Sequence, residues 1–133
     1  MQLSKSQKIE LSIIALAAII FLTVFLNLKN LHIKFYNKTG EDIDSLVVGD
    51  TYIGQIKKDS STEFINFKGL LFDSGFPREK ITAIINKKKL HHINGSWCAS
   101  GRKMVTEGEI IYDIQIDSDK NGNPYLNLRN PYQ

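Results

Sequence analysis

The strongest pattern in the chain is an unbroken apolar run near the N-terminus. Residues 11–28 contain no charged side chain, and Lys8 and Lys29 flank them. As a helix, the run would be roughly 27 Å long, close to the thickness of a bilayer's hydrocarbon core. It would also be apolar on every face, whereas a helix of a soluble protein keeps a polar face for water. We therefore predict a transmembrane anchor over residues 9–29, preceded by a short tail over residues 1–8.

The anchor can be read in two ways, as a cleaved signal peptide or as an uncleaved signal anchor. A signal peptide would have small residues after its apolar core, but Ala15 and Ala17 lie inside the core. The uncleaved anchor is therefore favoured. Its orientation is nearly balanced, because Lys5 and Lys8 on one side face a similar number of lysines on the other. Since very short N-terminal tails usually stay inside, we expect the C-terminal domain outside the cytoplasm.

Beyond the anchor, apolar and polar residues alternate with a period of two. In residues 31–37, Leu31, Ile33 and Phe35 fall on one face, as in a half-buried strand. Similar runs cover residues 43–48, 52–57 and 62–67, and a long one covers 109–117, with a partner at 125–129 across the turn 119–123. Residues 77–90 fit either a helix begun by Pro77 or two strands joined at 86–89, and strands are favoured.

Short strands separated by frequent turn residues indicate an all-β fold. We predict that residues 31–133 form a small antiparallel β-sandwich, immunoglobulin-like or similar, close to the bilayer. The formal net charge of +3 is too small for a surface that neutralises many phosphates, which argues against nucleic-acid binding. The single cysteine, Cys98, excludes an intramolecular disulfide.

The most specific motif lies in the predicted last turn. Asp117, Asp119 and Asn121 alternate before Gly122, as in the first half of a calcium-binding loop. However, the twelfth position, which should carry a bidentate glutamate, is Leu128, and the flanking residues resemble strands and not helices. An ordinary hairpin turn is therefore favoured, with calcium at these three residues as the alternative.

Two other clusters contain residue types that carry chemistry. His91, His92 and Cys98 could bind zinc or form a nucleophile and base, but their spacing matches no zinc finger or ribbon, and a buried core position is favoured for Cys98. The basic run 87–89 could touch anionic lipid, although a solvated turn is favoured. The segment 101–103 lacks the glycine spacing of a phosphate loop.

The sequence therefore predicts location better than activity. We expect a non-enzymatic, membrane-anchored binding or structural module of the cell envelope, which acts on a protein partner near the bilayer and carries no cofactor. One alternative is a module stabilised by calcium in the 117–123 loop. The other is a thiol enzyme that uses Cys98 with His91 or His92.

Overall fold

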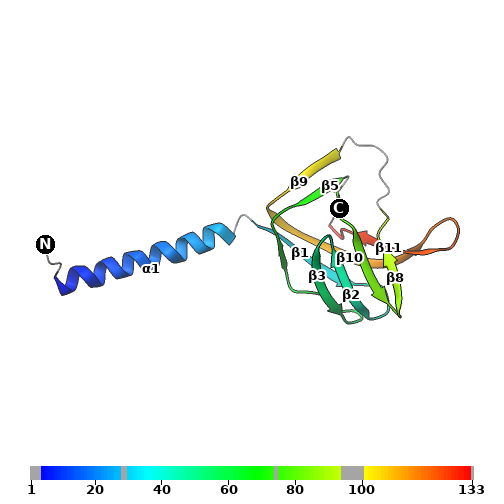
Figure 1. Cartoon of the computed structure of the whole chain (residues 1–133), viewed down its shortest axis with the longest axis horizontal. Helices are drawn as coiled ribbons and strands as arrows, with labels where there is room; N and C mark the ends of the chain where they lie inside the picture. The colour runs from blue at the N-terminus through cyan, green and yellow to red at the C-terminus, as the bar shows by residue number, and fades with distance from the viewer. Residues whose placement is uncertain (1–3, 28–29, 74, 94–100, 133) are drawn as a thin grey trace.

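The computed structural model describes residues 4–27, 30–73, 75–93 and 101–132. One helix is followed by a β-rich domain (Figure 1). The helix is α1 (Lys5–Asn27). The strands are β1 (Leu31–Asn37), β2 (Ile43–Val48), β3 (Thr51–Ile56), β4 (Ile65–Phe67), β5 (Leu70–Asp73), β6 (Phe76–Pro77), β7 (Ile81–Ile85), β8 (Lys88–His91), β9 (Arg102–Val105), β10 (Gly108–Ser118) and β11 (Pro124–Arg129).

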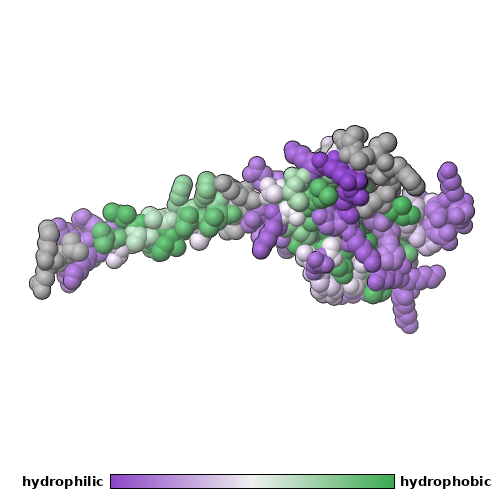
Figure 2. Space-filling view, turned by 45° about the horizontal axis from the view of Figure 1, so that its top comes forward, coloured by the Kyte–Doolittle hydropathy of each residue, from purple (hydrophilic) through white to green (hydrophobic). Residues whose placement is uncertain are grey.

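Helix α1 packs against no other part of the described chain. None of the apolar stretch Lys5–Leu26 is buried, and the side chain of Phe21 is 72% exposed. Its hydroxyl groups bond to the helix itself, since Ser12 Oγ donates to Lys8 O and Thr23 Oγ1 donates to Ile19 O. Figure 2 shows an apolar surface along the helix and many polar residues on the domain. The helix is long and apolar enough to cross a membrane, and it begins at Lys5, earlier than predicted.

The domain contains two four-stranded sheets and one three-stranded sheet. Sheet A has the order β11-β10-β1-β4, sheet B the order β3-β2-β7-β8, and sheet C the order β6-β5-β9. The predicted mainly β fold behind an N-terminal helix is confirmed, and all three sheets contribute side chains to one core. The arrangement resembles a sandwich, without features that identify it as immunoglobulin-like. One pairing departs from the antiparallel prediction, because β1 and β10 run parallel.

The predicted alternation accounts for the core. In β1 every second residue is buried, and Leu31, Ile33 and Phe35 are completely inaccessible to solvent. In β10 the buried positions are Tyr112 and Ile114. The β10–β11 hairpin follows the predicted strands, with Ile114 opposite Leu128 in its register.

Residues 77–90 contain two strands, as favoured, but the turn is shorter than expected. Asn86 and Lys87 both have positive φ, 50° and 63°, as in a type I′ hairpin turn. Lys88 and Lys89 therefore belong to β8 and not to the turn. Pro77 lies in β6, opposite Phe72, and starts no helix.

Sheet C was missed by the sequence analysis because its strands are very short or polar. β6 has only two residues, and in β9 Val105 is the one residue that is not fully exposed. β9 is held by its pairing with β5, where Leu70 lies opposite Val105. Such strands show no alternation of their own, since their conformation comes from the partner strand.

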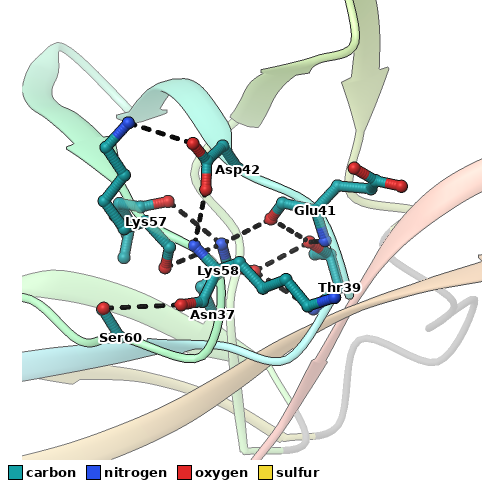
Figure 3. A network of polar contacts seen from close by, with 8 residues as sticks. Asn37, Thr39, Glu41, Asp42, Lys57, Lys58 and Ser60 are labelled. Carbon is teal, nitrogen blue, oxygen red and sulfur yellow. Dashed lines mark hydrogen bonds and ion pairs between the residues drawn. The ribbon is translucent and has the colours of Figure 1, made fainter.

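A buried asparagine joins the ends of three strands (Figure 3). Asn37, the last residue of β1, is completely buried. Its Nδ2 donates to Glu41 O (2.8 Å), before β2, and to Ile56 O (3.0 Å), at the end of β3. Its Oδ1 accepts hydrogen bonds from the backbone N and the Oγ1 of Thr39, at 3.1 and 2.7 Å. Nearby, Asp42 accepts from the backbone N of Lys58 (2.8 Å). These contacts connect the end of sheet A to the end of sheet B.

Asn37→Ala should strongly destabilise the domain. The substitution removes the buried hydrogen bond to Ile56 O and leaves the backbone N–H of Thr39 without its acceptor, so we expect a loss of about 3 kcal/mol in the free energy of unfolding. Urea unfolding of the full chain in detergent micelles, followed by the β-sheet circular dichroism signal, measures it. Asn66→Ala, at an exposed position of β4, is the matched control. Equal losses in the two variants would contradict the structural role of Asn37.

Candidate interaction surface

The outer face of sheet A carries an ordered set of polar and aromatic side chains. It is formed by the residues of β1 and β10 that alternate with the buried ones. Because the two strands are parallel and in register, their outward residues form rows. The rows are His32 beside Glu109, Lys34 beside Ile111, and Tyr36 beside Asp113.

Aromatic rings and lysines lie together at the β4 side of this face. Lys34 Nζ is 5.4 Å from the centre of the Tyr36 ring and 5.6 Å from that of Phe64. Lys38 Nζ lies 6.0 Å from the Tyr36 ring. These distances are typical of cation–π contacts. Phe64 is 40% exposed, so part of its ring faces solvent. Partly exposed aromatic rings are enriched at protein interfaces, and this cluster is therefore the best candidate contact area on the sheet.

Charge is separated by strand across the same face. The outward positions of β1 and the residues just beyond it carry His32, Lys34 and Lys38, with no carboxylate among them. The outward positions of β10 carry Glu109, Asp113 and Asp117, with no cation among them. The surface, which we call the sheet A face, thus has a basic column on β1 beside an acidic one on β10. On the other side of the acidic column, Arg129 of β11 lies opposite Asp113. The sequence analysis missed it, because alternation predicts which residues of a strand face outward but not which strands are neighbours.

The predicted calcium residues lie at the β10–β11 turn. Asp119 Oδ1 accepts hydrogen bonds from the backbone N of Asn121 (2.8 Å) and Asn123 (2.9 Å), and its Oδ2 accepts from Asn123 Nδ2 (3.1 Å). These hydrogen bonds, of which the one from the Asn123 backbone N–H has the largest effect, hold the pKa of Asp119 below its usual value. Asp117 Oδ1 accepts from the backbone N of Ser118. The Asp119 carboxylate thus closes the turn itself, and calcium binding here stays a prediction.

The structure separates the two histidines that the sequence placed together. His91 is exposed in β8, whereas His92 is half-buried and its Nδ1–H donates to Leu126 O (3.0 Å). The His92 ring also lies 6.3 Å from the Phe76 ring. Cys98 lies outside the described residues, so the thiol hypothesis is untested. Among the residues that the structure describes, no group of three or more histidine, cysteine, aspartate or glutamate side chains could hold a metal.

The other predicted clusters are solvent-exposed. Lys87, Lys88 and Lys89 occupy the tip of the β7–β8 hairpin and the start of β8, and all three are exposed. Arg102 and Lys103, in the discarded phosphate-loop segment, are exposed residues of β9.

A buried tyrosine of β10, Tyr112, also makes a polar contact. The hydroxyl of Tyr112 donates to Gly75 O (2.8 Å), which links sheet A to the start of β6. Burial raises the pKa of this hydroxyl above its ordinary value, so the group remains a neutral donor. Its ring lies 6.3 Å from that of Phe35 and 6.4 Å from that of Phe76. Tyr112 therefore stabilises the junction of sheets A and C.

The stability of the domain should fall as the pH drops through about 6.5. Burial lowers the pKa of His92 below its ordinary 6.5, although the bond to Leu126 O opposes the shift. Below that pH the unfolded chain binds a proton that the folded chain does not, which favours unfolding. Urea midpoints between pH 8 and 5 should therefore decrease for the natural chain. The decrease should be smaller for His92→Gln, whereas the exposed-site control His91→Gln should keep it. If the urea midpoint of His92→Gln falls with pH as steeply as that of the natural chain, His92 is not the group responsible.

Asp119→Ala should lower the melting temperature of the chain with or without calcium, because three hydrogen bonds of the turn are lost. Lys120→Ala, in the same turn, is the control. Thermal unfolding in millimolar calcium and in chelator measures both effects. A calcium-dependent rise that disappears when Asp117 and Asp119 are both replaced by alanine would establish the calcium alternative instead.

Comparison with known proteins adds no relative from which a role could be transferred. No family model, no curated protein and no solved structure matches the chain. The surfaces described above therefore have to be interpreted from their own chemistry.

Proposed function

We propose that the chain is a single-pass, membrane-anchored binding or structural module of the cell envelope, which is not an enzyme and engages a protein partner near the bilayer. The observation that supports the anchor best is the exposure of α1. An apolar helix with every face open to its surroundings is unfavourable in water, at about 25 cal/mol per Å² of apolar surface, and favourable in hydrocarbon.

The short connection between α1 and β1 supports action close to the membrane. The helix ends at Asn27 and β1 begins at Leu31. Four Cα–Cα steps span at most about 14 Å, so the start of β1 stays close to the end of the helix. Gly108 pairs with Leu31 and therefore belongs to the same, bilayer-facing end of the domain. The 119–123 turn follows the far end of β10, and the sheet A face extends between the two ends.

The sheet A face is the surface that suits a protein partner. It combines partly exposed aromatic rings, a lysine held over two of them and carboxylates on the neighbouring strand. Interfaces use such mixtures, in which rings supply contact area and charges supply orientation. An anchored domain with such a face would meet partners that lie in, or on, the same membrane.

The anchor predicts that the chain resists alkaline extraction from membranes. Leu16→Arg combined with Ile20→Arg should release it, because each arginine at the centre of a membrane helix costs about 2.5–3.5 kcal/mol on insertion scales. The matched control, Leu16→Ala with Ile20→Ala, should stay with the membrane. A natural chain that is extracted as readily as the arginine variant would contradict the proposal.

A C-terminal reporter active only outside the cytoplasm should be active when fused after residue 133. The complementary reporter, active only inside, should be silent. The opposite result would place the domain in the cytoplasm, and the envelope role would then be wrong even though the anchor stands.

A further inference from the structure

The charges of the sheet A face are arranged so that this face can bind the same face of a second copy. The two columns lie side by side because the strands are parallel and in register, and their charges alternate in height. Glu109 and Asp113 are level with His32 and Tyr36, whereas Lys34 lies between them, level with Ile111. This face is therefore complementary to a copy of itself, provided that β1 of one chain meets β10 of the other.

Anchoring in the same membrane limits the twofold axes that can relate two copies of the chain. Two copies inserted in the same direction can be related by a twofold axis only if the axis is parallel to the membrane normal. If β1 and β10 run roughly along this normal, an axis between the two strands turns one sheet A face onto the other. Each outward residue of β1 then faces the residue of β10 with which it pairs in the register, but on the second copy and at the same height.

We infer that the partner met by the sheet A face is a second copy of this chain, in a parallel face-to-face dimer. This inference rests on the proposed membrane anchor. In the dimer, His32 faces Glu109 of the second copy, and Tyr36 faces Asp113 of the second copy. Each pair can form a hydrogen bond from the ring N–H or the phenolic O–H to a carboxylate. Lys34 lies between these rows and covers Ile111 of the second copy with its aliphatic stem.

An axis that passes through either strand is unfavourable. An axis through β1 would set Lys34 against Lys34, and an axis through β10 would set Asp113 against Asp113. Like charges opposed at an interface repel each other. Charge therefore favours an axis between columns of different charge, as in the proposed dimer.

The size of the face makes the dimer dependent on the membrane. Four strands about 4.8 Å apart and a few rows of side chains give a flat area of about 400 Å². A stable interface usually buries about 800 Å² on each partner. Anchoring compensates for part of this difference, because it raises the local concentration and aligns the two domains before they meet.

Chemical cross-linking of the full chain in phospholipid vesicles tests the dimer. In a Cys98→Ser background, chains carrying His32→Cys are mixed with chains carrying Glu109→Cys. The two cysteines are on separate chains, because they would be neighbours within one chain. Since stacked sheets lie about 10 Å apart, a short bis-maleimide is used and not direct oxidation. The two kinds of chain carry different epitope tags, so that only mixed dimers are counted and cross-links between two Glu109→Cys chains are excluded. We expect about tenfold more mixed dimer from this mixture than from the control mixture of Tyr52→Cys and Glu109→Cys, equivalent to about 1.4 kcal/mol.

Charge exchange provides a second and independent measurement. Glu109→Lys alone and His32→Glu alone should each reduce the cross-linking of uncharged reporter cysteines at position 111. The first replaces the carboxylate that accepts from His32 by a cation next to the height of Lys34, and the second sets a carboxylate against Glu109 of the second copy. A mixture of the two variants should restore it, since the mixed dimer then contains one natural pair and one exchanged pair. Restoration cannot arise from general loss of folding.

The outcomes separate the dimer from the anchor. If the chain resists alkaline extraction but the 32 and 109 mixture yields no more dimer than the Tyr52 control, the inference is wrong and the proposed anchor stands. Failure of exchange to restore cross-linking overturns it as well. If the chain does not remain in the vesicles, both the anchor and the dimer are wrong. Enriched cross-linking with restoration supports the dimer.

Discussion

The buried amide of Asn37 is the interaction on which the rest of the domain most depends. It lies at the end of β1, the strand that pairs with both β4 and β10, and its NH₂ group satisfies carbonyls at the end of β3 and before β2. Without it, Ile56 O would lose a buried hydrogen bond, at a cost of about 1–3 kcal/mol, whereas Glu41 O would keep the Thr39 hydroxyl as a donor. One side chain therefore joins the two four-stranded sheets at the end of the domain that is far from the helix.

The position of β1 also determines which end of the domain lies next to the helix. The strand begins within a few residues of the helix, so its first residue, Leu31, and the paired Gly108 belong to the end of the domain next to the helix. The outward side chains of β1 and β10 extend from this end along one exposed face. The short connection limits the orientations that the domain can adopt, which makes the sheet A face a defined surface.

The motifs that suggested chemistry have structural explanations where the structure describes them. Asp119 bonds to the backbone of its own turn, and His92 bonds to the Leu126 carbonyl beside an aromatic ring. Aspartate before Asn-Gly is common in hairpin turns for this reason, since its carboxylate accepts local backbone N–H groups. The surface with the greatest potential for recognition, by contrast, contains no motif at all.

The sequence by itself determined the apolar helix, the alternating strands and most of the core, because these depend on periodicity between near neighbours. The two strands in residues 81–91 were also predictable, although the positive φ of Asn86 and Lys87 shortened the turn. Only the tertiary structure decided the parallel pairing of β1 with β10, the strands of sheet C and the buried position of Asn37. Each of these depends on residues far apart in the chain, whose pairing no local pattern records. The sheet A face belongs to this second group, since its two charged columns become one surface only when β1 and β10 are neighbours.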